Sequence, residues 1–347
     1  MSSCIYCGSE ANGREHWLPR SLGTFGPLQV LHDKICETCN GVLGREVDEA
    51  FIRTGPEAIL RLGLGIDGRR GPGVNPFYHR AATSQLVRAT NISPGDEPEL
   101  LWETYRGENG EPQGRLLQQL VVIDGQGIRH LIPFNPAWTA EILRAALGHR
   151  HIENGTLREV YLDEEHLQQV RPVLREVFPG FEAELFGRSG AGQTVRRLGF
   201  ENNLGPDYFR GLSKIALHGA LRLVPELDGH AHEFDSLRRF IRYAELPASR
   251  PIWHTPGSLI AGLGNGVMLR DWGHVVAVEA GEDQIFVMLQ FFIGPGATPP
   301  VWVVHLGPRP TGVQPDLGIA YFAHYLERPS QDGLTGEFMR LDMRASP

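Results

Sequence analysis

Four cysteines arranged as two Cys-x-x-Cys pairs constrain this chain more than any other feature of its sequence. The pairs are Cys4 with Cys7 and Cys36 with Cys39, and the sequence contains no other cysteine. Each spacing lets two thiolates bind one tetrahedral zinc ion, as in zinc ribbons and treble-clef knuckles. The interval between the pairs is too long for a tight knuckle and long enough for a β-hairpin. The N-terminal segment is therefore predicted to be a hairpin held by a structural zinc ion.

A short polar strand is predicted between the two cysteine pairs. It carries Glu15 and His16, ends at Pro19, and is followed by a loop that contains Gly23 and Gly26. Adjacent residues of a strand point to opposite faces of the sheet. We therefore expect Glu15 and His16 to have different surroundings and different roles.

The second cysteine pair leads into a predicted helix with Asn40 at its start. Asp48 lies about two turns beyond Asn40 and is expected to face back towards the hairpin. The residues assigned to the apolar face of this helix are Val42, Leu43, Val47, Phe51 and Ile52.

These motifs resemble the HNH, or ββα-metal, nuclease superfamily, in the bacterial subgroup whose core is held by four zinc-binding cysteines. The resemblance covers about residues 1–54, a small part of the chain. It rests on Cys-x-x-Cys-Gly, Glu-His-x-x-Pro, Cys-x-x-Cys-Asn and an acidic residue eight positions after the Asn. Carried over residue by residue, His16 matches the first His of the family name and Asn40 matches the Asn. Asp48 matches the final position, and Glu15 matches the acid that often precedes the first His.

The resemblance implies a catalytic site for phosphodiester hydrolysis. His16 would be the general base that activates water, because neutral imidazole has its pKa near working pH. Glu15 and Asp48 would hold a single Mg²⁺ or Mn²⁺ ion against the scissile phosphate. Asn40 would hold the His-bearing loop in register. The resemblance also implies products with a 5′ phosphate and a 3′ hydroxyl.

An aspartate at the final position departs from the family pattern, in which His or Asn is common. A carboxylate there suits a hard cation that prefers oxygen ligands. Glu46 and Glu49 lie in the same predicted helix, so the choice between Asp48 and these two glutamates stays open.

Charge limits where nucleic acid can bind. The formal net charge is −8 at pH 7, which argues against a broadly basic binding protein because phosphate contacts dominate such affinity. Basic and acidic residues balance over residues 1–80, so any contact with DNA, or with RNA, is expected to be local to that segment. The candidates to contact the nucleic-acid backbone are Arg14, Arg20, Arg45 and Arg53.

The sequence also favours a cytoplasmic location. The N-terminus lacks the basic and then apolar stretch of a secretory signal, and no apolar run is long enough to cross a bilayer. We therefore expect no membrane insertion and reduced thiols that are available to zinc.

The predicted fold class is α+β, with a small zinc-bound ββα module followed by a larger mixed region that ends in an antiparallel sheet. Residues 1–60 are expected to form the zinc module, residues 61–78 a linker rich in glycine and proline, and residues 79–347 one accessory domain. The elements predicted in the accessory region are a β-hairpin over 116–134, a helix opened by Asn135 and Pro136, a strand over 157–162, helices over 164–178 and 207–223, a helix capped by Asp235, and strands over 267–269, 274–278, 284–292, 301–306 and 317–322.

Basic residues on the two helices after residue 207 have two interpretations. Lys214 lies on the first helix, and Arg238, Arg239 and Arg242 lie on the second. They would form a basic face for DNA or for a nucleotide, or they would simply face solvent, which is the default expectation.

Three functions remain open at this point. The first is a metal-dependent DNA endonuclease whose C-terminal domain selects the substrate or binds a protein partner, as in a bacterial defence, restriction or mobile-element effector. The second is a nuclease gated by a small nucleotide ligand, which an apolar pocket with converging polar groups would support. The third is a non-catalytic zinc adaptor that binds nucleic acid. Duplex cleavage by a single one-metal site would need two visits or two protomers, so a homodimer is compatible with the first two.

Overall fold

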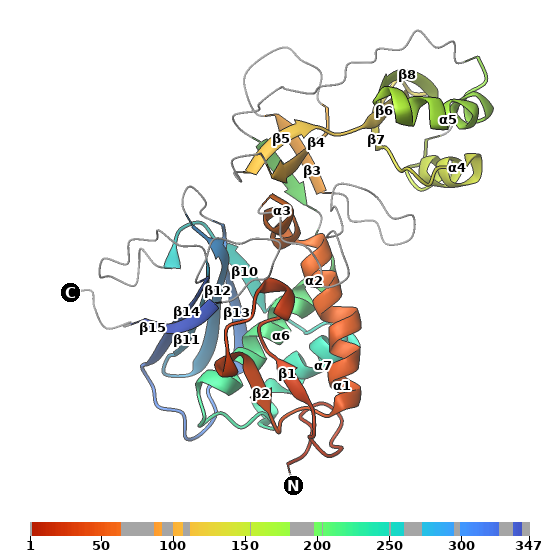
Figure 1. Cartoon of the computed structure of the whole chain (residues 1–347). Helices are drawn as coiled ribbons and strands as arrows, with labels where there is room; N and C mark the ends of the chain where they lie inside the picture. The colour runs from red at the N-terminus through yellow and green to blue at the C-terminus, as the bar shows by residue number, and fades with distance from the viewer. Residues whose placement is uncertain are drawn as a thin grey trace. The chain divides into compact units, whose positions relative to one another are not determined.

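The computed structural model describes most of the chain and divides it into two compact units (Figure 1). Unit 1 contains residues 1–61, 65–73 and 204–347, and unit 2 contains residues 62–64 and 74–203. The described residues are 2–63, 87–91, 100–106, 112–152, 154–180, 198–202, 204–249, 251–259, 273–294, 299–325 and 336–341. The zinc module and the C-terminal part of the chain therefore belong to one unit, and the middle of the chain forms the other.

This division differs from the expected one, in which residues 79–347 form a single domain after the zinc module. The physical reason is that the helix Pro206–Leu223 (α6) contacts the N-terminal hairpin and helix, so the first 61 residues and the last 144 share one core. Most of the expected linker over 61–78 lies outside the described residues, as do the strand expected over 267–269 and residues 181–197.

A β-hairpin opens unit 1. Strand β1 (Arg14–His16) pairs antiparallel with β2 (Val30–His32), with Glu15 opposite Leu31. The loop between them contains two short 3₁₀ segments, η1 (Arg20–Leu22) and η2 (Pro27–Gln29). The strand is thus present where the sequence predicts it, and it is only three residues long.

The buried amide of Gln29 holds this loop in shape. Its Nε2 donates to the carbonyl oxygens of Leu18 and Gly23, at 2.7 and 2.8 Å, and its Oε1 accepts from the backbone N–H of Phe25 at 3.0 Å. A buried amide that is satisfied at both ends stabilises a loop that has no regular hydrogen-bond pattern of its own.

A long helical segment follows the hairpin. It comprises α1 (Glu37–Val42), the π-helical stretch η3 (Leu43–Asp48) and α2 (Glu49–Thr54), and after Gly55 a further helix, α3 (Pro56–Gly63), begins. Cys36 caps α1, because its Sγ accepts from the backbone N–H of Cys39 at 3.4 Å. The expectation that Asn40 starts the helix is therefore wrong. The cysteine thiol, which the sequence pattern assigns only to zinc, also serves as the cap.

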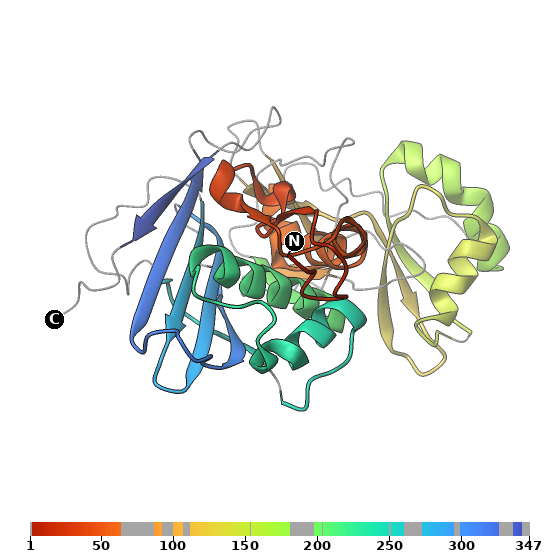
Figure 2. The same ribbon diagram turned by 90° about the horizontal axis from the view of Figure 1, so that it is seen from below.

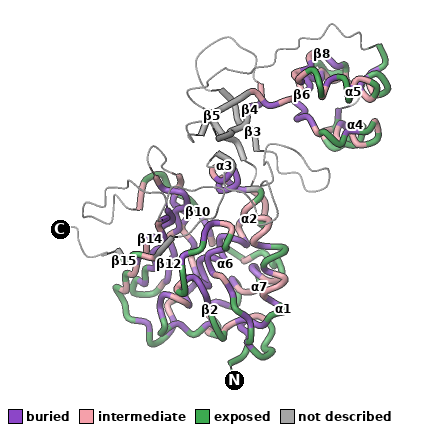
Figure 3. Tube along the Cα trace, viewed as in Figure 1, coloured by how far each residue is buried: buried purple, intermediate pink, exposed green. Residues whose placement is uncertain are grey.

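Helix α6 occupies the centre of unit 1. Proline at its first position and Gly205 before it begin the helix, and almost every residue from Tyr208 to Leu223 is buried (Figure 3). It contacts β2, η3 and α2 on one side and the C-terminal sheet on the other (Figure 2). Gly211 permits a close approach, because a Cβ atom there would lie 2.5 Å from Cβ of Phe51.

A six-stranded antiparallel sheet ends the chain, as predicted for the fold class. The strand order is β10-β13-β12-β11-β14-β15, and helix α7 (Asp235–Tyr243) precedes the first of these strands. The bounds of the strands are β10 Ile252–Thr255, β11 Gly273–Ala280, β12 Gln284–Ile293, β13 Val301–Pro308, β14 Leu317–Tyr325 and β15 Gly336–Leu341. The edge strands β10 and β15 have no counterpart among the predicted elements.

Unit 2 is a smaller α+β arrangement with its own apolar core. A three-stranded sheet in the order β7-β6-β8 packs against two helices, and two further strand pairs, β3 with β9 and β4 with β5, accompany it. The bounds are β3 Val87–Asn91, β4 Trp102–Arg106, β5 Pro112–Leu116, β6 Gln119–Ile123, β7 Arg129–Pro133, α4 Ala140–Gly148, β8 Thr156–Tyr161, α5 Glu164–Val177 and β9 Leu198–Asn202. The predicted hairpin β6–β7 and helix α5 are confirmed. In either unit, no described helix is long and apolar enough to cross a membrane.

Candidate functional site

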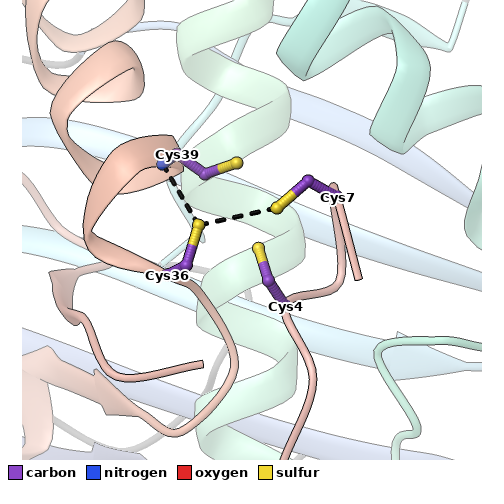
Figure 4. A group of neighbouring side chains, drawn as sticks. All are labelled: Cys4, Cys7, Cys36 and Cys39. Carbon is purple, nitrogen blue, oxygen red and sulfur yellow. Dashed lines mark hydrogen bonds between the residues drawn. The ribbon is translucent and has the colours of Figure 1, made fainter. Parts of the chain in front are cut away.

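The four cysteine side chains converge at the N-terminus (Figure 4). Their sulfur atoms all lie within 4.8 Å of one another, and Cys7 Sγ lies 3.6 Å from Cys36 Sγ. Zinc bound to four thiolates at about 2.3 Å requires sulfur atoms roughly 3.8 Å apart. The observed spacing is close to this value, and four thiolates complete a tetrahedron without a further side chain. The four cysteines therefore fit a structural zinc ion.

The surroundings of the thiols are unequal. Hydrogen bonds from Ser9 lower the pKa of the exposed Cys7 to about 6. Burial raises the pKa of Cys39 to about 12, against a lowering hydrogen bond from Arg242. A bound zinc ion would stabilise all four thiolates, and the Arg242 guanidinium would offset part of their negative charge.

Strand β1 presents its two polar side chains to different environments, as its alternation predicts. Glu15 faces the interior and is 2% exposed, whereas His16 is half-buried at the surface. Burial and the neighbouring Arg20 lower the pKa of His16. Arg14 and Arg20 are both exposed beside it, and Asn40 Nδ2 donates to the carbonyl oxygen of Arg14 at 3.1 Å.

Glu15 meets Asp48 at a buried ammonium. Lys214 Nζ forms ion pairs with Glu15 Oε1 and with Asp48 Oδ1, the latter at 3.0 Å. It also donates to Asp48 Oδ2 at 3.1 Å and to the backbone carbonyl oxygen of His16 at 3.0 Å. Two segments that are far from α6 in the sequence, β1 and the end of η3, thus supply oxygen atoms to one lysine of that helix.

The π-helical stretch η3 directs Asp48 into this cluster. Asp48 is its last residue, and Leu43 and Val47 on the same stretch are buried. A π-helical turn rotates the residues that follow it relative to a regular α-helix, and such turns are frequent at functional sites. Among the three acids that the sequence leaves open, Asp48 shares the Lys214 ammonium with Glu15, whereas Glu49 pairs with Arg53 at 2.5 Å and Glu46 lies 3.8 Å from Arg210.

The cluster extends further into the core through His218 and Tyr6. His218 Nδ1 lies 3.6 Å from Glu15 Oε1, and its Nε2 lies 2.7 Å from the hydroxyl of Tyr6. Lys214 and His218 are four residues apart, so they occupy one face of α6. Burial lowers the pKa of His218, so a neutral ring between an acid and a phenol is the favoured form.

Lys214 and burial set the charges of the two acids. Burial alone would raise the pKa of Glu15, but Lys214 and His218 hold it at about 2. Burial raises the pKa of Asp48 to about 6, although Lys214 lowers it. Asp48 keeps 19% of its side chain exposed, so its carboxylate borders the surface and that of Glu15 does not.

The donor set does not fit a divalent cation in this arrangement. The predicted ligands Glu15 and Asp48 do come together, but the position between them is filled by the Lys214 ammonium. Lys214 is 0% exposed, so the expectation that it faces solvent is wrong. The other residues predicted for the site have these positions. Asn40 contacts the backbone of Arg14, and Arg53 pairs with Glu49. The side chains that are exposed are those of Arg14, Arg20 and Arg45.

Sequence reasoning missed the contributions of Lys214, His218 and Tyr6. A signal was present, because Lys214 and His218 stand four residues apart within the largely apolar stretch 211–221, and Lys34 is the only other lysine. Comparisons of the chain with protein-family models, with curated proteins and with solved structures find no match.

Proposed function

We propose that unit 1 is a DNA endonuclease that hydrolyses phosphodiester bonds with His16 as the general base. The observation that carries the proposal is the position of His16. Its half-buried imidazole lies on strand β1, and the charges of the exposed Arg14 and Arg20 act on it. Within the described residues, no hydrogen bond or ion pair engages this ring.

The arginines supply the contacts that a phosphate requires. A guanidinium donates two parallel hydrogen bonds to phosphate oxygens, so Arg14 and Arg20 would hold a nucleic-acid backbone beside the imidazole. Both side chains are exposed. The negative net charge of the chain then limits binding to this local basic rim.

The hydrolytic step uses one water molecule. A neutral His16 takes a proton from that water while its oxygen bonds to phosphorus, and the bond from phosphorus to the 3′ oxygen breaks. The departing 3′ oxygen takes a proton from solvent, and His16 returns its proton to solvent. The products are a 5′ phosphate and a 3′ hydroxyl, as in the nucleases that the motifs resemble.

Mg²⁺ or Mn²⁺ remains part of the proposal only as a cofactor to be tested. A divalent cation bound at Glu15 and Asp48 would stabilise charge on the leaving oxygen. The Lys214 ammonium already pairs with both acids. No step of the reaction is therefore assigned to a cation at these residues.

Plasmid nicking by the purified zinc-bound protein tests the proposal, with and without added Mg²⁺ or Mn²⁺. Replacing His16 by alanine should lower the rate at least about 100-fold, the usual effect of removing a general base. His232→Ala is the matched control, because His232 is an exposed histidine of the same unit, with 87% of its side chain accessible. Equal nicking by wild type and His16→Ala would refute the proposal.

A non-catalytic, nucleic-acid-binding zinc module is the second candidate. It is favoured by the Lys214 contacts, which neutralise the acids that a metal-dependent nuclease would use. This candidate expects DNA binding that weakens on replacing Arg14 and Arg20 and no nicking under any condition. Electrophoretic mobility shifts measured beside the nicking assay separate the two.

The structure gives little support for a nucleotide-gated nuclease. The pocket bounded by α6, α7 and β10 has a volume of about 360 Å³ and is lined by Leu204, Pro206, Phe209, Phe240, Leu246, Pro247, Ala248, Ser249, Pro251 and Ile252. Among these lining residues, which all belong to the described part of the chain, only Ser249 has a polar side chain. A phosphate-bearing ligand would need cationic or several hydrogen-bonding groups there.

A further inference from the structure

The oxygen atoms around Lys214 form a cation site whose occupant is a side chain of the protein itself. They come from the carboxylates of Glu15 and Asp48 and from the backbone carbonyl of His16. Carboxylate and carbonyl oxygens are also the ligands that hard divalent cations prefer. An ammonium and a divalent cation therefore compete for the same donors.

The lysine is fixed in place by its helix. Lys214 is 0% exposed, and its neighbours Ser213, Ile215, Ala216 and Leu217 are buried as well. A divalent ion could enter only if the ammonium left, and a charged amine without oxygen partners is costly in a protein interior. Within the described residues, the oxygens that contact Nζ are those of Glu15, His16 and Asp48 alone.

The ammonium is held by two hydrogen bonds and by charge. Nζ donates to Asp48 Oδ2 and to the backbone carbonyl oxygen of His16, and it forms ion pairs with the carboxylates of Glu15 and Asp48. The bond to the His16 carbonyl also fixes the backbone that carries the proposed general base. Lys214 thus acts on His16 through its main chain and on the acids through their charge.

We infer that Lys214 is the resident cation of the Glu15–Asp48 pair, so that in the intact protein this pair takes no divalent ion. Lys214 is then a positioning residue for His16. The catalytic meaning of this role rests on the proposed endonuclease activity, but the occupancy of the pair does not. In the intact protein both carboxylates form ion pairs with Lys214, and they become available to a metal ion only when the lysine is removed.

Binding of Mn²⁺ to the zinc-loaded protein, followed by electron paramagnetic resonance, tests this inference without DNA. Wild type and Asp48→Asn should bind Mn²⁺ equally, because Asp48 is not a ligand in either. Lys214→Met should gain one bound Mn²⁺ per chain, with an affinity at least about tenfold above that of wild type. The double variant Glu15→Gln/Lys214→Met should lose this gain.

Wild-type binding of Mn²⁺ that falls in Asp48→Asn would overturn the inference, as would a folded Lys214→Met protein that gains no Mn²⁺. If Lys214→Met does not fold, the comparison of Mn²⁺ binding between wild type and Asp48→Asn still tests whether the acid pair binds a divalent ion. The nicking assay tests the endonuclease activity independently. The expected Mn²⁺ pattern together with no nicking would refute the endonuclease and leave Lys214 as the resident cation.

Discussion

Two glutamates in unit 1 are almost equally buried, but their pKa values are shifted in opposite directions. Glu15 is 2% exposed and has its pKa held at about 2, because Lys214 and His218 outweigh burial. Glu57, at the start of α3, is 3% exposed, and burial raises its pKa to about 8. The Tyr208 hydroxyl donates to Glu57 Oε1 at 3.1 Å, and no cation lies against it among the described residues.

The difference shows that burial alone does not fix the state of a carboxyl. A cation nearby keeps Glu15 ionised, whereas a single hydroxyl leaves Glu57 protonated at neutral pH. The two residues are therefore buried in different protonation states. Glu15 belongs to a charged cluster beside the candidate site, and Glu57 behaves as a neutral packing residue.

Zinc removal should cause the largest change, because the four clustered thiols would lose the cation that stabilises them as thiolates. We expect a chelator to unfold the hairpin and α1, because binding of a structural zinc ion contributes on the order of 10 kcal/mol to folding. Circular dichroism melts with and without chelator measure this, and added zinc should restore the original transition. An unchanged melt in protein shown to be free of metal would disprove a structural role.

Loss of the Lys214 charge should make Glu15 resemble Glu57. We expect Lys214→Met to lower the free energy of unfolding by about 3–5 kcal/mol, because it leaves buried carboxylates without a partner. Lys34→Met is the matched control at the only other lysine of the chain, and it should change stability by less than about 0.5 kcal/mol. Urea unfolding monitored by fluorescence measures both variants.

The double variant Glu15→Gln/Lys214→Met sharpens this test. It removes the stranded carboxylate together with its partner, so part of the lost stability should return. If Lys214→Met is as stable as wild type, the ion pairs do not hold the hairpin to α6.

A change at Glu57 should produce the smallest effect and a characteristic dependence on pH. Its folded pKa, about 8, lies above its ordinary value of 4.5, so the folded protein binds more protons between these limits. The stability that Glu57 contributes is therefore fully present below about pH 4.5 and is lost as pH rises through 8.

Glu57→Gln should remove this dependence, because a neutral amide keeps the contact with Tyr208 at every pH. Urea unfolding at pH 6 and at pH 9 should show a smaller difference for Glu57→Gln than for wild type. Equal differences in the two proteins would mean that Glu57 is already ionised at neutral pH, like Glu15.

Local sequence patterns predicted the parts of the site that short segments determine. The cysteine spacing, the alternation of Glu15 and His16, and the helix carrying Asp48 all depend on neighbours within a few residues. The start of that helix was misplaced at Asn40, because the thiol of Cys36 takes the capping position. The sequence also predicted most of the described strands of the terminal sheet, because their β-branched and aromatic residues favour strands.

The position of Lys214 could not be predicted in the same way. A lysine in a helix is usually solvated, and its burial here depends on α6 being covered by the hairpin on one side and by the sheet on the other. For the same reason the expected accessory domain over 79–347 was too large. Contacts between segments about 200 residues apart leave no periodic signal in the sequence.

The separation of Glu15 from Lys214 in the chain has a consequence for biosynthesis. The cysteines, the hairpin and the helix through Asp48 leave the ribosome first, and all of unit 2 follows before α6 appears. At typical elongation rates this interval lasts on the order of ten seconds. Glu15 and Asp48 therefore lack their lysine partner until α6 has been synthesised.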